Sequence, residues 1–487
     1  MHCFPTARLG RAALLLPVLL TGACASVPNL GPRPEMRAAS AYASAQSFAA
    51  ARSDWPADGW WKSYGDAQLD RLVEEALAGS PDLAAAAARM RTAEGFAQRA
   101  GAALKPTVDA FAQPELAKQS QNQAMPAAAI PNGWNDSGSV GLSLSLDLDL
   151  WGKNRAAMRA SNADADAAHY ELHEAELALT TGIASTYADL ASLYARRDSL
   201  ESVLDIRGQT ARLVAQRVDA GLDTQAELKQ ATARVAQARG DIEATDESIA
   251  LTKHALAALL GAGPDRSLTI ARPAIGSLHA QGLPADASID LIGRRPDIAA
   301  YRARVEAAGH RIKEAKAAFY PNISLTGLIG LSSFGLGNLF SSGSTFGSVT
   351  PAVSLPLFHG GALQGQYRGR RGQYDEAVAL YDASVIKALR ETADAVTSQK
   401  SLASQLEQSR SALADFEEAH RLARQRYEHG LSTYLDVLSA EEGVVSARLQ
   451  VSALETRAFT LDVQLIRALG GGFATPNTKG AGGFNAA

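Results

Sequence analysis

The sequence predicts a mixed fold, in which membrane β-strands from several chains form one barrel and lead into long antiparallel α-helical hairpins. Three observations support this prediction. The 487-residue chain contains two copies of one long pattern, each copy has segments in which apolar and polar residues alternate, and each has a long stretch without proline. Alternation is typical of strands with two unlike faces, and a long proline-free stretch is typical of a helix.

Composition excludes several classes of protein. The 47 Lys and Arg residues nearly balance the 51 Asp and Glu residues, giving a formal net charge of -4, so nucleic acid is not an expected partner. The two cysteines, Cys3 and Cys24, leave no material for a disulfide framework or a cysteine metal site in the body of the chain. No apolar run after residue 24 has the roughly 20 residues of a membrane-spanning helix.

The first 23 residues are predicted to be an export signal. Arg8 and Arg11 precede an apolar run over residues 12–20, and small residues follow it. This order is the three-part form of a secretory signal, and the run is too short to anchor the chain as a membrane helix.

The sequence that ends this signal, Leu20 to Cys24, resembles the lipobox of bacterial lipoproteins, although Thr21 stands where the lipobox usually has leucine. The resemblance implies that Cys24 is diacylated and becomes the first residue of the mature chain. Ala25, in place of aspartate, favours sorting to the outer membrane. The alternative is an ordinary signal peptide with an incidental cysteine; lipidation is favoured because Cys24 is the one cysteine that the mature chain keeps.

The duplication is visible in matched landmarks. Pro81-Asp82 corresponds to Pro296-Asp297, and Gly221-Leu222 corresponds to Gly430-Leu431, with nearly the same separation in both cases. Two long copies with one internal order indicate a duplication and not a solenoid of short repeats.

Alternation locates the strands. From Val140 to Leu150 every second residue is apolar, and the intervening positions are mostly serine and aspartate. In isolation this pattern also suits the edge of a soluble sheet. Four strands are expected per chain, over about residues 106–114, 139–151, 321–331 and 348–358.

Four strands cannot close a barrel in lipid, because the smallest membrane barrels have about eight strands and an open edge leaves backbone groups unpaired. Several chains must therefore contribute to one barrel. Three copies would supply about twelve strands, an even number in the usual range.

Two helical hairpins are expected, over residues 153–261 and 362–469. Neither long first arm contains proline, and Gly221 and Gly430 are placed to form the turns. Apolar or small residues at spacings of three and four along the first arm indicate coiled-coil packing between antiparallel helices.

The order, spacing and duplication of these motifs resemble the TolC/OprM family of outer-membrane efflux channels, in particular its lipoprotein, NodT-like branch. The resemblance extends over essentially the whole mature chain. Its main motifs are Trp60-Trp61, Pro81-Asp82-Leu83, Leu146 to Lys153, Arg295-Pro296-Asp297, Tyr320-Pro321-Asn322 and Leu469 to Gly472.

The family resemblance implies a homotrimer with one twelve-stranded barrel in the outer membrane and a helical barrel in the periplasm. The corresponding division of the chain is a signal peptide, a lipidated N-terminal segment, a first repeat, an equatorial link, a second repeat and a C-terminal tail, over residues 1–23, 24–66, 67–261, 262–290, 291–470 and 471–487.

The implied function is passive conduction of drugs or other small molecules. The implied partners are a periplasmic adaptor, an inner-membrane pump of the resistance-nodulation-division type and outer-membrane lipid. Neither a catalytic residue nor a cofactor is implied. Two alternatives remain: a TolC-like protein-secretion duct, and a periplasmic coiled-coil scaffold held to the membrane by its lipid alone.

The resemblance also implies a periplasmic gate near Gly430. Leu435 matches an apolar ring, Asp436 an acidic ring and Tyr427 a tyrosine of a locking network in TolC-like channels. Two positions depart from the family pattern: Ser439 stands where aspartate is common, and Ser432 stands where those channels place an arginine.

Leu435, Val437 and Leu438 could instead belong to the hairpin core and Asp436 to a solvated face. In a trimer, however, three Asp436 carboxylates would repel one another, which raises their pKa, and would attract cations. His169 and His173 have a spacing that zinc can use, but no third ligand lies nearby in the sequence, so no metal site is expected.

Overall fold

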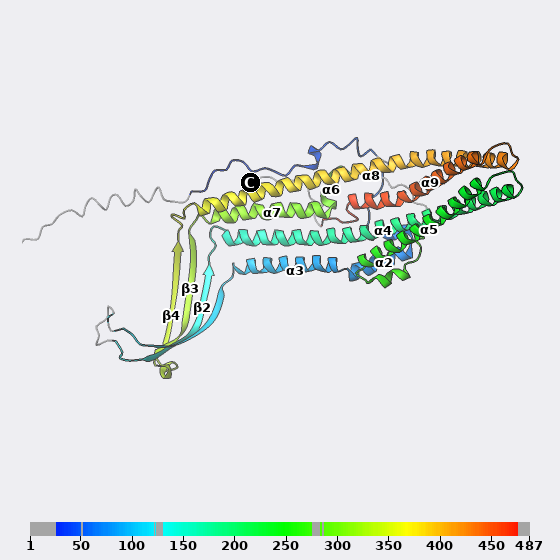
Figure 1. Cartoon of the computed structure of the whole chain (residues 1–487). Helices are drawn as coiled ribbons and strands as arrows, with labels where there is room; N and C mark the ends of the chain where they lie inside the picture. Colours follow the sequence, from blue (N-terminus) through cyan, green and yellow to red (C-terminus); the bar gives the residue numbers. More distant parts are fainter. Residues whose placement is uncertain are drawn as a thin grey trace, which may run out of the picture. The chain divides into compact units, whose positions relative to one another are not determined.

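Four antiparallel strands form one sheet in the described part of the chain, in the order β1-β2-β3-β4 (Figure 1). The computed structural model describes residues 26–49, 52–120, 122, 130–274, 283–284 and 287–475. The number of strands agrees with the sequence prediction. Their bounds are Thr107–Ala117 for β1, Asn135–Asp147 for β2, Asn322–Phe334 for β3 and Thr345–Ser354 for β4.

The register gives the sheet two unlike faces. Leu142 lies opposite Ala110 and Ile329, whereas Ser145 lies opposite Thr107 and Thr326. Because side chains alternate between faces, whole rows of the sheet share one polarity. The apolar face is exposed in the single chain: Val108, Leu142, Ile329, Val349 and Val353 have exposed fractions of 59%, 48%, 67%, 74% and 69%.

Strand β2 ends earlier than its sequence pattern predicts. The alternation continues to Leu150, but the strand stops at Asp147. Asp149 adopts a positive φ of 43°, and its carboxylate accepts hydrogen bonds from the backbone N–H groups of Asn154 and Arg155 at 2.8 and 3.0 Å. The chain therefore turns at Asp149 to begin the next helix.

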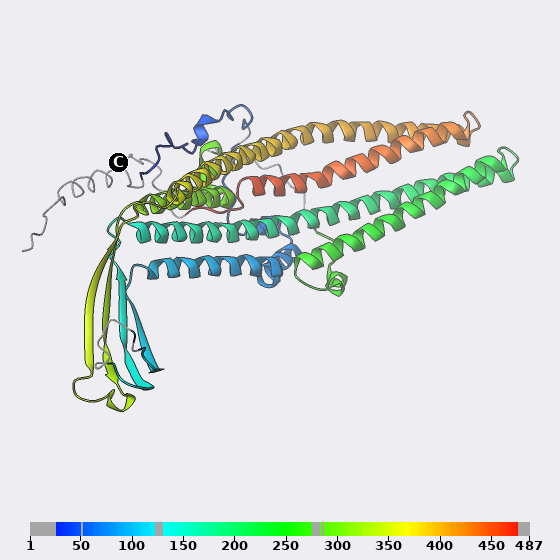
Figure 2. The ribbon, with the colours of Figure 1, turned by 60° about the vertical axis from the view of Figure 1, so that its left-hand side comes forward.

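The two long hairpins have equal dimensions in the two copies (Figure 2). Helices α4, Lys153–Asp219, and α8, Ala362–Glu428, each have 67 residues. Their return helices α5, Gln225–Leu259, and α9, Tyr434–Ala468, each have 35. The duplication that the sequence predicts is thus repeated in the helices. No helix in the described residues is both long and apolar enough to span a membrane.

Each copy contains shorter helices before its first strand, which the sequence analysis did not predict. Helix α3, Pro81–Ala102, precedes β1, and helix α7, Pro296–Ala317, precedes β3. Both begin with proline followed by aspartate, because proline suits the first helical position and an acidic residue is favourable near a helix N-terminus. The remaining elements are α2 (Ala67–Gly79), α6 (Ala287–Arg294) and the 3₁₀ turns η1 (Ala39–Ala41), η2 (Trp60–Tyr64), η4 (Pro264–Thr269) and η5 (Leu336–Asn338).

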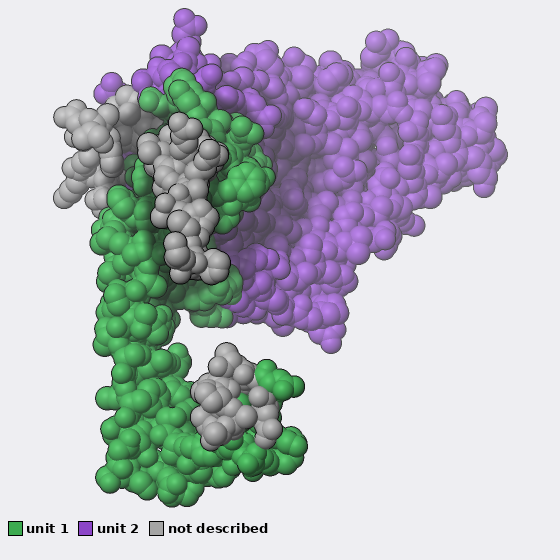
Figure 3. Space-filling model, turned by 90° about the vertical axis from the view of Figure 1, so that its left-hand side faces the viewer, with its two compact units in different colours: residues 1–36, 90–168, 301–381 green, residues 37–89, 169–300, 382–487 purple. Residues whose placement is uncertain are grey.

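The chain divides into two compact units, which Figure 3 shows in different colours. The first contains the sheet and the helical segments adjoining it, over residues 1–36, 90–168 and 301–381. The second contains residues 37–89, 169–300 and 382–487. The largest apolar cluster of the second unit includes Trp60, Tyr64 and Tyr187.

Two tyrosine hydroxyls in this core are paired with carboxylates. The Tyr64 hydroxyl donates to Asp462 at 2.6 Å, and the Tyr187 hydroxyl donates to Asp66 at 2.7 Å. Asp66 also caps α2 by accepting the backbone N–H groups of Gln68 and Leu69. The tryptophan-tyrosine segment near residue 60 is therefore a packing element of this core.

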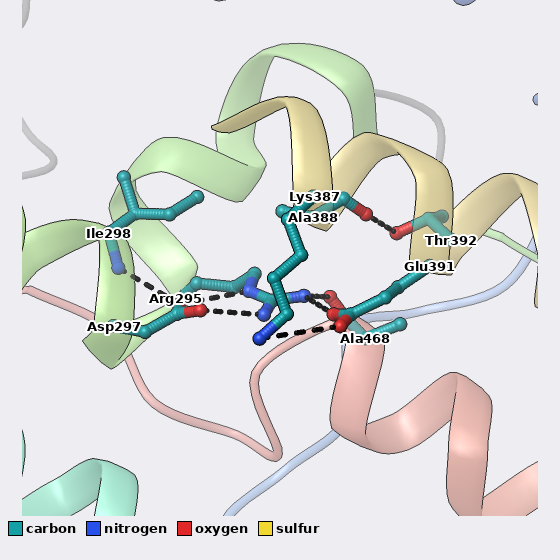
Figure 4. A network of polar contacts seen from close by, with 8 residues as sticks. All are labelled: Arg295, Asp297, Ile298, Lys387, Ala388, Glu391, Thr392 and Ala468. Carbon is teal, nitrogen blue, oxygen red and sulfur yellow. Dashed lines mark hydrogen bonds and ion pairs between the residues drawn. The ribbon is translucent and has the colours of Figure 1, made fainter. Parts of the chain in front are cut away.

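Arg295, between α6 and α7, is the centre of a buried ionic network (Figure 4). Its guanidinium contacts the carboxylates of Asp297 and Glu391, each at 2.7 Å, and donates to the carbonyl of Ala468 at 3.2 Å. Gly470 approaches the same turn so closely that a Cβ there would lie 2.0 Å from the carbonyl oxygen of Arg294. The arginine of the Arg-Pro-Asp motif thus joins the end of α9 to the start of α7.

Glu174 in this region gives a testable pH dependence. Burial, followed by the charge of Asp297, raises the pKa of Glu174 from 4.5 to about 7. The folded protein therefore binds a proton that the unfolded chain has released, and stability falls as the pH rises from about 4.5 to 7. Glu174→Gln should flatten this slope and raise the unfolding temperature at pH 8, measured by thermal unfolding of the purified protein across pH.

Glu243→Gln, at an exposed position of α5, is the matched control and should keep the wild-type slope. Equal slopes for wild type and Glu174→Gln would contradict the role assigned to Glu174.

Candidate functional site

The tips of the two hairpins have the same backbone design. Each turn uses a glycine with positive φ, 71° at Gly221 and 73° at Gly430. Each return helix then starts with a capping box, in which a threonine and the acidic residue three positions later bond reciprocally. The pairs are Thr224 with Glu227 and Thr433 with Asp436.

The side chains at the two tips differ. Asp223 precedes the first capping threonine, whereas Ser432 precedes the second. Tyr427 lies in the last turn of α8, at the position that Val218 occupies in α4. One tip therefore presents a carboxylate and the other presents a phenol.

These two groups meet together with an arginine. The Tyr427 hydroxyl donates to the Asp223 carboxylate. Arg217 of α4 contacts the same carboxylate through Nε at 2.9 Å and donates to the backbone carbonyl of Tyr427, also at 2.9 Å. Its guanidinium lies 4.4 Å from the centre of the Tyr427 ring. We refer to Arg217, Asp223 and Tyr427 as the tip lock.

The tip lock is shielded from water. Tyr427 is completely buried, and the side chains of Arg217 and Asp223 are 13% and 8% exposed. Burial and the neighbouring Asp223 carboxylate raise the pKa of Tyr427, so its hydroxyl remains a neutral donor. Hydrogen bonds to charged groups contribute more than neutral ones, typically about 1.5–3 kcal/mol.

An apolar cluster surrounds the lock. Tyr427 packs with Tyr434, Val437 and Leu438 of the second hairpin and with Val214 and Ala231 of the first. Val437 and Leu438 are therefore part of the core between the hairpins, as one sequence interpretation allowed.

A second ionic contact joins the hairpins farther along. Glu441 of α9 lies 3.5 Å from Arg207 of α4 and accepts a hydrogen bond from the Thr210 hydroxyl at 3.0 Å. Burial raises the pKa of Glu441, while Thr210 and Arg207 oppose this effect. Arg234 of α5 pairs with the adjacent Glu442 at 2.6 Å.

Leu435, Asp436 and Ser439 are all exposed, on the side of α9 away from the buried residues Tyr434, Val437 and Leu438. Leu435 has an exposed fraction of 69%, so it is not part of the hairpin core within one chain. Hydrogen bonds from Thr433 lower the pKa of Asp436 within one chain. Ser432 donates to the carbonyl of Ala423 at 3.5 Å, and the arginine that the family would place at 432 is instead supplied by Arg217.

The sequence analysis named Tyr427 but not its partners Arg217 and Asp223. A signal for them was present, because aligning the two copies sets Asp223 against Ser432 and so marks a charge found at one tip alone. The described residues contain no group of three or more His, Cys, Asp or Glu side chains that could hold a metal.

Cys24 lies outside the described residues, but the segment that follows it is bound to α8. Arg371 donates to the backbone carbonyls of Gly31 and Pro32, and Arg33 lies 5.8 Å from the ring centre of Tyr374. The N-terminal segment therefore follows the first turns of α8.

Comparison with known proteins gives a consistent result. The family model described as "Outer membrane efflux protein" matches residues 72–262 and 289–471. The chain is 31% identical over 430 residues to the multidrug resistance outer membrane protein MdtP of Escherichia coli O6:H1, which covers 87% of this chain and 88% of that protein. It is 30% identical over 466 residues to the pyoverdine export outer membrane protein OpmQ of Pseudomonas aeruginosa, covering 95% of this chain and 96% of that protein.

The structure is similar to that of the outer membrane protein VceC from Vibrio cholerae. The TM-score is 0.83 at 42% sequence identity, and the match covers 86% of this chain and 100% of that chain.

The tip lock predicts a measurable change in local stability. Tyr427→Phe removes one hydrogen bond to the Asp223 carboxylate and keeps the ring in the apolar cluster. We expect amide hydrogen exchange at both tips to become roughly tenfold to a hundredfold faster, which corresponds to a loss of about 1.5–3 kcal/mol.

Tyr434→Phe is the matched control, since Tyr434 is also buried in this cluster and its hydroxyl has no hydrogen-bond partner among the described residues. Equal protection of the tips in both variants would show that the Tyr427 hydroxyl does not hold them together.

Proposed function

Since the chain belongs to the outer membrane efflux protein family, we propose that three copies form the exit channel of a tripartite efflux system. The channel conducts small molecules that an inner-membrane pump and a periplasmic adaptor deliver to it. The observation that carries the proposal is the four-stranded sheet, which has one exposed apolar face, one polar face and two open edges.

The open edges support assembly of several chains. Strands β1 and β4 each have a neighbour on one side within the chain, and their other backbone groups need partners in lipid. Three copies joined edge to edge close a barrel of about twelve strands.

The two faces of the sheet define the interior of the barrel. Apolar rows face lipid, and the rows containing Thr107, Ser145 and Thr326 line a polar lumen. A lumen of this kind suits water-soluble or amphiphilic cargo. Two relatives are named for multidrug resistance and for pyoverdine export, and we extend to this chain the transport of drugs or other small molecules.

Transport through this channel is passive in our proposal. The pump, of the resistance-nodulation-division type, supplies the energy, and the chain supplies a passage and no chemical step. The chain needs neither a cofactor nor a catalytic residue for this role.

The hairpin tips form the periplasmic gate in this proposal. Opening requires the α4–α5 hairpin to separate from the α8–α9 hairpin, which breaks the tip lock and then the contact between Arg207 and Glu441. Leu435 and Asp436, which are exposed in one chain, line the closed pore as an apolar and an acidic ring. Ser439 extends the same exposed side by one turn.

Cys24 anchors the N-terminal segment to the membrane in this proposal. Gly31 is held at Arg371, which lies nine residues after the start of α8, or about 14 Å along the helix. The seven residues from Cys24 to Gly31 reach up to about 24 Å when extended. An acylated Cys24 can therefore enter the same membrane surface from which α8 begins.

Ion selectivity tests the acidic ring. Within one chain, hydrogen bonds from Thr433 lower the pKa of Asp436, whereas repulsion among the three carboxylates of a ring raises it. The ring therefore loses its charge as the pH falls through the resulting pKa. Asp436→Asn should reduce the cation preference of the channel several-fold at pH 7 in planar bilayers. The decline of cation preference in acid, expected for the wild type, should be absent in this variant. Asp415→Asn, which removes an exposed carboxylate of α8, is the control. Unchanged selectivity in Asp436→Asn would refute the ring.

Native mass spectrometry tests assembly and lipidation together. We expect a trimer in mild detergent whose subunits begin at Cys24 and carry acyl groups. Cys24→Ala should lose the acyl mass and still form the trimer, because the strand edges hold the chains together. A monomeric wild-type protein would overturn the shared barrel.

A further inference from the structure

A basic hollow of about 460 Å³ lies where the sheet meets the helices in the first unit. It is formed by the segment that leads from β2 into α4 and by the end of α7, which leads into β3 (Figure 1). Five basic side chains line it, namely Arg155, Arg159, His310, Lys313 and Lys316.

Most of this positive charge has no acidic partner. Arg155 pairs with Asp149 at 3.1 Å, whereas Arg159, Lys313 and Lys316 form no ion pair within the described part of the chain. Glu306 faces the site from α7, where it lies 3.7 Å from His310. The field is thus positive across the hollow, and a bound anion would be stabilised there.

His310 lines the hollow and is largely buried. Its Nδ1 atom is buried and has no hydrogen-bond partner among the described residues. Burial is the main cause that lowers the pKa of His310, with Lys313 and Arg159 acting in the same direction against Glu306.

Two aromatic residues border the hollow. The rings of Trp151 and Tyr320 are stacked, with centroids 5.0 Å apart and an interplanar angle of 21°. Both residues remain exposed, by 51% and 40%. They lie beyond the end of β2 and before the start of β3, at the level where membrane barrels carry aromatic girdles.

The same aromatic pair also borders an adjoining hollow of about 520 Å³. Leu150, Ile323 and Leu355 are among its lining residues, and Ile323 belongs to the apolar face of the sheet. One side of the aromatic pair is therefore basic and the other includes apolar side chains. This arrangement matches an amphiphile with an anionic head and an acyl chain.

A neighbouring chain would not cover this place. The hollow adjoins β2 and β3, which are the central strands of the sheet, whereas β1 and β4 carry the open edges. Each chain of a trimer would keep its own copy of the site.

We propose that the basic hollow binds the phosphate of an anionic phospholipid from the membrane leaflet on the helical side. Arg159, Lys313 and Lys316 contact the phosphate, Trp151 and Tyr320 pack against the glycerol region, and the acyl chains pass along Leu150 and Ile323. Basic pockets at the membrane surface bind anionic headgroups in this way. The proposal requires insertion in the membrane and does not depend on which cargo is transported.

Titration of the full-length protein with phosphatidylglycerol in mild detergent, followed by native mass spectrometry, tests the site. The variant R159Q/K313Q/K316Q should bind phosphatidylglycerol at least tenfold more weakly than the wild type. R302Q/R368Q/R370Q removes the same charge from other positions of the same unit and should bind as the wild type does. Phosphatidylcholine should bind all three proteins equally weakly.

Inorganic phosphate distinguishes a lipid site from a soluble-anion site. We expect no displacement of phosphatidylglycerol by millimolar phosphate. Displacement that depends on the same three residues would assign the hollow to soluble anions and overturn the lipid proposal. Equal phosphatidylglycerol binding by the two triple variants would exclude a site in this hollow.

Fluorescence gives the position independently of affinity. A phospholipid with a spin label in its headgroup should quench part of the wild-type tryptophan emission, and Trp151→Phe should remove that quenched part. Retained trimer mass in every variant separates loss of the lipid site from loss of the channel. Quenching that is unchanged in Trp151→Phe would contradict the proposed location.

Discussion

In a bilayer each unpaired backbone amide or carbonyl costs several kcal/mol, so a sheet with two open edges needs partners for β1 and β4. Much of the architecture follows from this requirement. Duplication supplies two strand pairs per chain, which join through β2 and β3 into one four-stranded unit with a consistent register. Strand β2 leads directly into α4, and β3 directly follows α7. Strand order thus also determines the order in which the helices leave the sheet.

The two copies have one backbone design and unlike side chains, and this difference makes a specific contact between the tips possible. If each tip had an aspartate at the position of Asp223, the two carboxylates would repel each other. If each tip had only a tyrosine at the position of Tyr427, Arg217 would have no carboxylate to bind. The resemblance to TolC-like channels implies an arginine at position 432, where this chain has serine. The structure supplies the arginine from α4 instead, which keeps the cation and its carboxylate on one hairpin and the phenol on the other.

The family, the number of strands and the two long hairpins were predicted from the sequence, and the relatives and the structure confirm them. These features depend on local periodicity and on the order of motifs. The alternation of leucines misplaced the end of β2 because Leu148 and Leu150 continue the pattern after the backbone has turned at Asp149. Helix α3 was missed because its 22 residues have little amphipathic character and lack the long proline-free stretch that identified α4 and α8. The tip lock joins residues some two hundred positions apart, and neither propensity nor periodicity carries information about such a pair.

Comparison of the two copies also shows which of the two principal residues of the proposed gate is explained by helix capping alone. Asp436 has an acidic counterpart in Glu227, and both accept hydrogen bonds from a capping threonine at the start of a return helix. Helix capping alone therefore explains an acid at this position in both copies. Leu435 corresponds to Ala226, and packing among the described residues leaves this large apolar side chain 69% exposed. Exposing leucine to water is unfavourable unless another surface covers it. In our proposal the apolar residue is thus the stronger reason to place this side of α9 at the pore axis.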